Sequence, residues 1–328
     1  MVKKALIFGI ISFLLFARPQ TLSSWGFFAH KKINRLAVLT LPPGMIGFYK
    51  KNIEYVTEHA IDPDKRRYAM EGEAPRHYID IDHYSEEDPF GVMPRKWNDA
   101  VEKFTEDTLM AYGIVPWHID KMVWRLTKAF KEENFGLILK YSADLGHYVG
   151  DSYVPLHTTE NYNGQMTGQR GIHGFWESRL PELFADEQYD FFVGRAKYIE
   201  YVLNHSWETV EASYAAKDSV LLFEAKLTEE YPSDRKYNYE TRGTVTMKTY
   251  SREFSKLYHI HLNGMVERRM KGAVITTGSL WYTAWVNAGK PDLDKFSEKT
   301  IPEKLLKEIS DDDEKFKTGK IKGRKHGN

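Results

Sequence analysis

The sequence predicts an all-α fold, built as a single compact multi-helix domain, and three observations support this prediction. Apolar residues recur at spacings of three and four positions through most of the chain, which is the pattern of amphipathic helices. Strand-like alternation is scarce, and residues 244–250 are the best candidate for a strand. The chain of 328 residues is 42% hydrophobic and 28% charged, which is typical of a globular protein with a large core.

The helical spacing occurs in six stretches of the chain. They are residues 33–39, 97–112, 119–130, 135–149, 191–220 and 254–285. Pro116 suits the first position of a helix, where its missing N–H would be unpaired in any case. Pro155 disfavours helical conformation at Val154, so we expect the fourth helix to end there.

The N-terminus has the order of a secretory signal. Lys3 and Lys4 precede an apolar run over residues 5–16, and small residues follow it. The run is 12 residues long, whereas a membrane-spanning helix needs about 20. We therefore expect residues 1–24 to be a signal peptide and the protein to be exported, periplasmic or secreted, with Trp25 first. An uncleaved interfacial anchor is the alternative.

The C-terminal residues differ in composition from the rest of the chain. After Pro291 aromatic residues become rare, an acidic run covers residues 311–314, and residues 315–325 hold six basic residues and no acidic one. We expect residues 25–288 to form the domain and residues 289–328 to form a charged, mobile tail. Nothing in the sequence indicates a stable protein partner, or a transmembrane anchor once the signal is removed.

Charge and cysteine content exclude several kinds of site. Lys and Arg together number 46, as do Asp and Glu, so the formal net charge is zero. Removing the signal takes away three basic residues and leaves 43 against 46. A strongly basic nucleic-acid surface is therefore not expected. With no Cys, disulfides and thiolate metal sites are excluded, and any transition metal must be held by His, carboxylates and backbone groups.

The most informative stretch contains residues with the spacing of metal ligands. His147 and Asp151 lie four apart in a helical pattern, so they project from one face. His157 follows just beyond the expected helix end. Asp144, one turn before His147, is positioned to hold the second nitrogen of that ring.

His173 and Glu177 repeat the spacing of four, after a glycine-containing segment that we expect to be a flexible loop. Taken alone, such a pair is more often a surface hydrogen bond than a metal site. Two pairs and a flanking His within 31 residues are harder to explain in that way. Imidazole and carboxylate ligands without thiols fit Zn²⁺.

With these residues, the sequence resembles the superfamily of bacterial zinc-dependent phospholipases C and fungal and plant single-strand-specific nucleases. The resemblance covers residues 25 to about 180 and rests on five segments in order. They are Trp25-Gly-Phe-Phe-Ala-His30, Asp62-Pro-Asp-Lys-Arg66, His77-Tyr-Ile-Asp80, His147-x-x-x-Asp151-x-x-x-x-x-His157 and His173-x-x-Trp176-Glu177. The combination is specific, although no single segment is.

The resemblance implies the compact helical fold of that superfamily and a cluster of three zinc ions. The first ion would be held by Asp62, His77, His147 and Asp151. The second would share Asp151 and take His30 with the amine and carbonyl of Trp25. The third would use His157, His173 and Glu177. Asp64 competes with Asp62 for the first ion, and we prefer Asp62 because its offset from His77 matches the nuclease pattern.

The implied reaction is hydrolysis of a phosphoester by a metal-activated hydroxide. Asp62 would orient the nucleophile as well as bind zinc. Lys65 or Arg66 would neutralise the phosphate oxygens, and the sequence does not choose between them.

The substrate is either a phospholipid or single-stranded nucleic acid. His77-Tyr-Ile-Asp80 resembles the nuclease segment that receives a base, so Tyr78 would stack on the base and Asp80 would bind its edge. Glu177 and the short segment before His173 resemble the phospholipases instead. The alternative function is a secreted, non-enzymatic binding protein that keeps a zinc cluster for stability.

Overall fold

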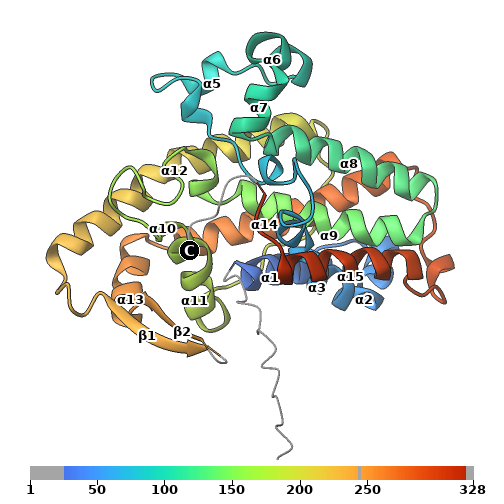
Figure 1. Cartoon of the computed structure of the whole chain (residues 1–328). Helices are drawn as coiled ribbons and strands as arrows, with labels where there is room; N and C mark the ends of the chain where they lie inside the picture. Colours follow the sequence, from blue (N-terminus) through green and yellow to red (C-terminus); the bar gives the residue numbers. More distant parts are fainter. Residues whose placement is uncertain (1–25, 243–244, 323–328) are drawn as a thin grey trace, which may run out of the picture.

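A computed structural model describes residues 26–242 and 245–322, and these residues are mostly helical, as expected (Figure 1). The long helices are α1 (Phe27–Val38), α8 (Val115–Lys131), α9 (Phe135–Ser152), α12 (Val202–Glu230), α14 (Met265–Asn287) and α15 (Glu303–Thr318). The shorter ones are α2 (Pro43–Lys51), α3 (Ile53–Glu58), α4 (Asp62–Arg66), α5 (Pro89–Val92), α6 (Trp97–Phe104), α7 (Glu106–Tyr112), α10 (Ile172–Gly174), α11 (Leu180–Gln188) and α13 (Arg252–His261). Single turns are η1 (His59–Ile61), η2 (Ala74–His77), η3 (Ile81–His83), η4 (Pro155–Thr158), η5 (Phe175–Arg179) and η6 (Asp294–Phe296).

Helix α9 lies at the centre of the domain and packs against α1, α8 and α14. Nearly all its residues are buried, because apolar side chains occur on every face of the helix. Trp281 of α14 is fully buried, stacks on Tyr49 with ring centroids 4.9 Å apart, and donates to the Ser142 carbonyl at 3.0 Å. The metal-ligand pattern of α9 is therefore held in the interior of the fold.

The apolar core forms two main clusters. The first cluster joins α2, α8 and α9 with the first half of α12 and the second half of α14. The second joins α11, α13 and the hairpin with the second half of α12 and the first half of α14. Helices α12 and α14 thus run through both clusters and connect them (Figure 1).

The expected strand is present. Strand β2 (Val245–Tyr250) pairs antiparallel with β1 (Tyr237–Arg242), with Tyr237 opposite Tyr250. This hairpin is the small exception to an otherwise helical structure within the described residues.

The helix expected over residues 191–220 begins only at Val202. Residues 191–201 instead run as an extended segment along α14. Their backbone N–H groups find other partners, since Lys197 donates to the Ser279 hydroxyl at 3.0 Å and Ile199 donates to the Thr283 hydroxyl at 2.9 Å. Phe191, Ala196 and Ile199 are partly buried against the core without helix formation, whereas Phe192 and Tyr201 are exposed.

Two other expected helices are interrupted by residues with positive φ. The stretch over residues 97–112 divides at Thr105, with φ of 68°, and the stretch over residues 254–285 divides at Asn263 and Gly264, with φ of 46° and 71°. Positive φ cannot continue a right-handed helix, so each stretch forms two helices.

The C-terminal residues differ from the mobile tail that we expected. Helix α15 packs against α4, and its Leu305 is buried. The apolar residues of this helix recur at helical spacing and form one apolar face. The many charged residues between them obscure this pattern in the sequence. The expectation of a mobile tail is therefore corrected for residues 303–318.

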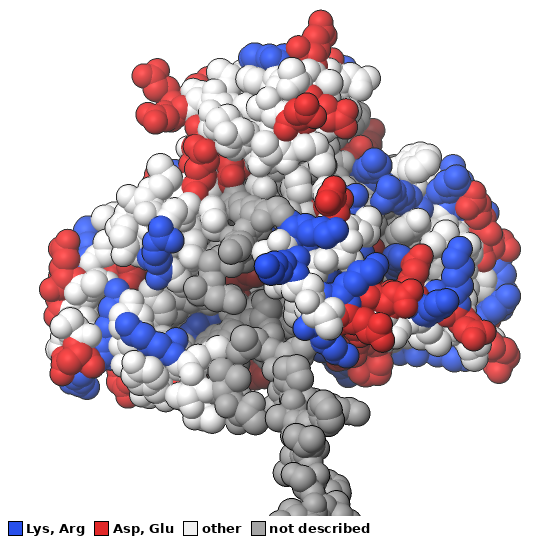
Figure 2. All heavy atoms as spheres, in the orientation of Figure 1, with Lys and Arg blue, Asp and Glu red and all other residues white. Residues whose placement is uncertain are grey.

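The surface carries both signs of charge. On the face shown in Figure 2, basic and acidic side chains are intermixed over the body, whereas the projecting α5–α7 segment shows mainly acidic ones. The expected signal peptide, residues 1–24, lies outside the described residues. Among the helices that are described, none is long and apolar enough to cross a membrane.

Candidate metal centre

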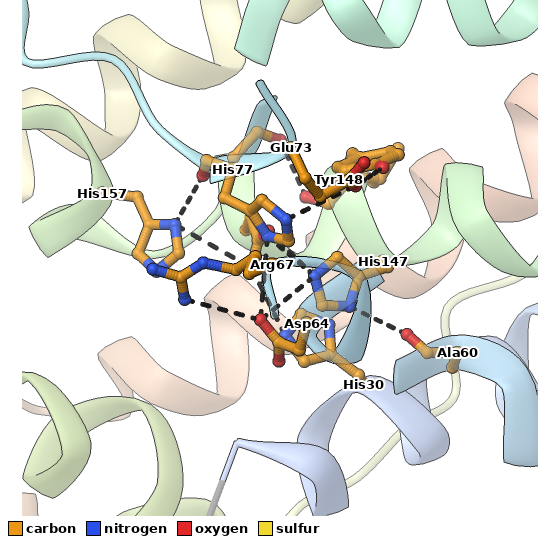
Figure 3. Close-up of polar contacts among 12 residues, drawn as sticks. His30, Ala60, Asp64, Arg67, Glu73, His77, His147, Tyr148 and His157 are labelled. Atoms are coloured by element: carbon orange, nitrogen blue, oxygen red, sulfur yellow. Dashed lines mark hydrogen bonds and ion pairs between the residues drawn. The ribbon is translucent and has the colours of Figure 1, made fainter. Parts of the chain in front are cut away.

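His30, His77 and His147, from three different elements, come together in the interior (Figure 3), and Asp151 faces all three. One carboxylate oxygen, Oδ2, lies 2.9 Å from His77 Nδ1 and 3.2 Å from His147 Nε2. The other oxygen, Oδ1, lies 3.3 Å from His30 Nε2. All four side chains are buried, so the predicted pair on α9 is joined here by His30 from α1 and His77 from η2.

Two glycines of α9 allow α1 to approach closely enough to deliver His30. A Cβ atom at Gly150 would lie 2.9 Å from His30 Nδ1, and a Cβ atom at Gly146 would lie 1.9 Å from Asn34 Oδ1. Glycine inside a helix costs about 1 kcal/mol relative to alanine. The close contact between the two helices explains why α9 carries glycine one residue before each of its two ligand candidates.

Asp64, and not Asp62, belongs to this group. Asp64 Oδ1 lies 3.8 Å from both His77 Nδ1 and His147 Nε2. Asp62 instead lies 2.8 Å from His59 Nδ1. Residues two apart on a helix point to opposite sides, so only one of the two carboxylates can face the histidines. Asp62, which we preferred as the ligand, therefore does not face the histidines.

A second group of donors lies beside the first. Glu177 Oε2 lies 2.7 Å from His173 Nε2 and 3.2 Å from His157 Nε2. The helix α9 ends before Pro155, so His157 lies on η4, and Glu177 lies on the π-helical turn η5 that continues α10. This group is joined to the first through His157 Nδ1, 3.8 Å from Asp151 Oδ1.

Backbone carbonyls fix the orientation of three of the rings. His147 Nδ1 donates to the Ala60 carbonyl at 2.8 Å, and His157 Nδ1 donates to the His77 carbonyl at 2.6 Å. His173 Nδ1 donates to the Tyr162 carbonyl at 3.1 Å. A carbonyl only accepts, so Nδ1 keeps its proton in each ring and Nε2 is the nitrogen that faces the group and could bind a metal once deprotonated.

Asp144 does not play the part that we expected of it. We predicted that it would hold the second nitrogen of His147, but that nitrogen is bound to Ala60. Asp144 Oδ2 lies 3.0 Å from Arg66 Nη2 instead. A buried guanidinium needs a carboxylate partner, and Asp144 is the partner of Arg66.

The donor atoms are spaced as a metal ion requires. Within three groups, His30–His147–Asp151, Asp64–His77–His147 and His157–His173–Glu177, the atoms lie within 4.8 Å of one another. A tetrahedral zinc ion with bonds of about 2.0–2.1 Å separates its ligand atoms by roughly 3.3 Å. Ring nitrogens of His77 and His147 lie 3.0 Å apart, and those of His157 and His173 lie 3.2 Å apart. These buried groups could hold metal ions.

The charges at the centre favour a bound cation. Burial alone would lower the pKa of His147, but the carboxylates of Asp151 and Asp64 outweigh burial and raise that pKa to about 9. Burial alone would raise the pKa of Asp151, yet His147 and His157 hold it well below its usual value. Glu177 is likewise kept ionised, since His173 and His157 hold its pKa well below the usual value. The carboxylates are therefore charged at neutral pH, as metal ligands must be.

The segment before His173, which we expected to be a flexible loop, is held by internal hydrogen bonds. Asn163 Oδ1 accepts from the Gly171 amide at 3.0 Å and from the His173 amide at 3.4 Å. Asn161 Oδ1 accepts from the Met166 amide at 2.9 Å. The segment thus orients His173 at the start of α10.

Of the basic residues in this region, Arg67 lies at the centre, which we did not foresee. Lys65 Nζ lies 3.2 Å from Asp62 Oδ1, and Arg66 is engaged with Asp144, so neither of our two candidates faces the histidines. Arg67 Nη1 lies 3.9 Å from Asp64 Oδ1, and Figure 3 shows its side chain between Asp64 and His157. Our two candidates, Lys65 and Arg66, lie one helical turn after Asp62. Arg67 lies one helical turn after Asp64, the carboxylate that faces the histidines.

Glu73 was also missed, although it lies four residues before His77. It is fully buried, its Oε1 atom lies 3.7 Å from His77 Nε2, and it accepts a hydrogen bond from the Tyr148 hydroxyl. Burial would raise its pKa, but hydrogen bonding to His77 and the charge of Arg66 lower it below the usual value. Glu73 is thus an ionised carboxylate behind His77, on the side away from Asp151.

Tyr78 and Asp80 are buried, with 4% and 6% of their surface exposed. Tyr78 packs where the chain leaves α7, and its hydroxyl donates to the Ala111 carbonyl at 3.4 Å. The Asp80 amide donates to the Tyr112 carbonyl at 2.7 Å. Recognition of a base by these two residues stays a prediction.

Trp25, the expected N-terminal ligand, lies outside the described residues. The described chain begins at Gly26, where a Cβ atom would lie 2.6 Å from Glu177 Oε1. The start of α1 therefore lies against the second donor group.

The fold and site define a helical domain with a buried His and carboxylate centre that could hold metal ions. A scan against protein-family models, a search of curated proteins and a search of solved structures found no match for this chain. The residues of the centre itself therefore indicate the function.

Proposed function

We propose that the chain is an exported zinc-dependent phosphodiesterase with three zinc ions. The observation that carries this proposal is the position of Asp151, whose two oxygens face different histidines. A carboxylate of this kind suits two metals about 3.5–4 Å apart, as in enzymes that displace groups at phosphorus. Structural zinc sites are usually closed four-ligand cages without a shared carboxylate, which favours catalysis over a purely structural role.

The proposed ligands follow the three donor groups. Asp64, His77, His147 and Asp151 would hold the first ion, Asp151 and His30 with the amine and carbonyl of Trp25 the second, and His157, His173 and Glu177 the third. Nitrogen and oxygen donors without thiols support zinc. When bound, zinc would lower the pKa of a water molecule and polarise the phosphate.

The chain's own residues would then orient the reactants. Arg67 would bind the phosphate oxygens, since its guanidinium lies beside the centre and matches phosphate in geometry. Glu73 would keep His77 in the orientation that presents Nδ1 to the metal. The burial of these groups excludes bulk water, so their electrostatic interactions are strong.

The test uses mature protein whose first residue is Trp25, confirmed by N-terminal sequencing. We expect hydrolysis of bis(p-nitrophenyl) phosphate, loss of hydrolysis on chelation and its recovery with Zn²⁺. Full zinc occupancy without turnover would overturn the enzymatic proposal and leave the zinc-stabilised binding protein. Parallel assays on phosphatidylcholine vesicles and single-stranded DNA separate the two substrate classes, and cleavage of lipid alone would remove the proposed role of Tyr78 and Asp80.

A further inference from the structure

Helix α15 makes contacts that bear directly on the segment carrying Asp64. In Figure 1 this helix lies across the domain beside α1 and α3. Near its start, Leu305 is buried and Glu308 forms an ion pair with Lys140 of α9. These contacts hold one end of α15 on the body of the domain.

Farther along α15, the contacts pass to the segment around α4. Asp313 Oδ1 lies 2.7 Å from Lys65 Nζ, the residue next to Asp64. The Lys65 side chain is only 14% exposed, so this ion pair is partly shielded from water. The charge of Lys65 is thus shared between Asp313 and Asp62.

Two further contacts continue the same interface. The Phe316 ring lies 4.9 Å from the Tyr68 ring and 6.2 Å from the Phe27 ring, measured between centroids. The Lys322 amide donates to the Arg67 carbonyl at 2.8 Å. One C-terminal segment therefore contacts the residues that directly follow Asp64 and the first turn of the helix that carries His30.

Helix α4 needs such support because it has only five residues. Helices of this length are not stable without tertiary contacts. A metal ligand must also be held within about 0.5 Å of its productive position, which an unsupported turn does not achieve. The contacts of α15 supply this restraint from the solvent side of α4.

We propose that α15 is a clamp that positions Asp64 and Arg67 in the metal centre, with Asp313 as a positioning residue acting through Lys65. The metal-dependent part of this proposal rests on the proposed function. The clamp itself is a property of the chain and is measurable without metal.

The test compares Asp313→Asn with Glu308→Gln. Both substitutions remove one carboxylate from the same helix, but only the first removes an ion pair with α4, whereas the second removes one with α9. In zinc-free protein we expect faster amide hydrogen exchange in residues 62–70 for Asp313→Asn and no change there for Glu308→Gln. In zinc-loaded protein we expect competition with a chelator to show about 10-fold weaker binding of one ion for Asp313→Asn. Glu308→Gln should stay within about 2-fold of the parent.

The conservative variant Asp313→Glu keeps the carboxylate and should restore both readouts. Unchanged exchange and unchanged zinc affinity in Asp313→Asn would overturn the clamp. An equal response to Glu308→Gln would also overturn it, because the effect would then be general stability of α15. If the parent protein binds no zinc, the proposed function fails, and the exchange measurement still decides whether the clamp exists.

Discussion

Asp64 Oδ1 lies 3.8 Å from His147 Nε2, so two residues far apart in the chain meet at one point of the centre. Asp62 lies on the other side of α4, beside His59. This difference makes the two carboxylates separable by experiment, because only one of them faces the histidines.

We expect Asp64→Asn to lower phosphodiesterase activity by about 100-fold or more and to weaken one metal site, since it removes a charged ligand. Asp62→Asn should leave the metal content unchanged. Elemental analysis together with the bis(p-nitrophenyl) phosphate assay measures both. The reverse ranking would return Asp62 to the ligand set.

Asp151→Asn and Glu177→Gln should differ in the number of ions lost. Asp151 faces His30, His77 and His147, whereas Glu177 faces only His157 and His173. Asp151→Asn should therefore retain about one ion per chain and Glu177→Gln about two. Zinc counts on purified protein check this, and equal losses in the two variants would argue against separate groups.

Zinc uptake should depend on pH through His147. The pKa of this ring in the metal-free protein is raised to about 9, so the ring carries a proton at neutral pH. Zinc binds only the neutral ring, so binding must release that proton. Below pH 9 the affinity should rise by up to about 10-fold per pH unit for this proton and level off above it. Calorimetry in two buffers of different ionisation enthalpy measures the release, and binding without proton release would contradict the prediction.

Gly146→Ala should destabilise the protein. The added Cβ atom would lie 1.9 Å from Asn34 Oδ1, between α9 and α1. Overpacking of this kind costs about 1–3 kcal/mol in the free energy of unfolding. Gly47→Ala in α2 is the matched control, because nothing lies within 4 Å of its Cβ position. That substitution should stabilise slightly, and urea unfolding of the two variants gives the comparison.

Arg67→Ala should lower activity without changing the metal content, because its proposed partner is the phosphate and not the metal. A loss of about 10²–10³-fold is expected for a donor that stabilises charge in the transition state. Arg67→Lys should recover part of the rate. Loss of zinc from Arg67→Ala would show instead that the side chain supports Asp64.

Local spacing predicted much of the site. His147 with Asp151 and His173 with Glu177 face one another as helical geometry requires, and Pro155 ends α9 where expected. These features depend only on residues a few positions apart, so the sequence alone contains the necessary information.

The sequence could not show which side chains of residues 62–67 face the metal centre. A helix of five residues can turn any of its faces toward the core. The observed orientation is set by contacts with α9 and α15, which are distant in the sequence. The roles of Asp64 and Arg67 therefore follow from tertiary docking and not from local pattern.

Contacts between distant parts of the chain also explain where the fold differs from the prediction. The apolar pattern of residues 191–201 is compatible with a helix, but hydroxyls of Ser279 and Thr283 bind its backbone in an extended form. The charges of α15 indicate a solvated tail, but Leu305 and Phe316 find partners on the domain. In both cases a distant element supplies the partner that decides the local conformation.

The metal centre lies between the two apolar clusters. His77 and His147 belong to elements packed with the first cluster, and Leu156 and Phe175, beside the second donor group, belong to the second. Helices α1, α12 and α14 contribute residues to both clusters, and the polar residues of the centre lie between them. Bound metal would act there as a cross-link between two half-cores, and its removal would allow one half to unfold before the other. The cooperativity of unfolding, and not only the stability, would then depend on metal.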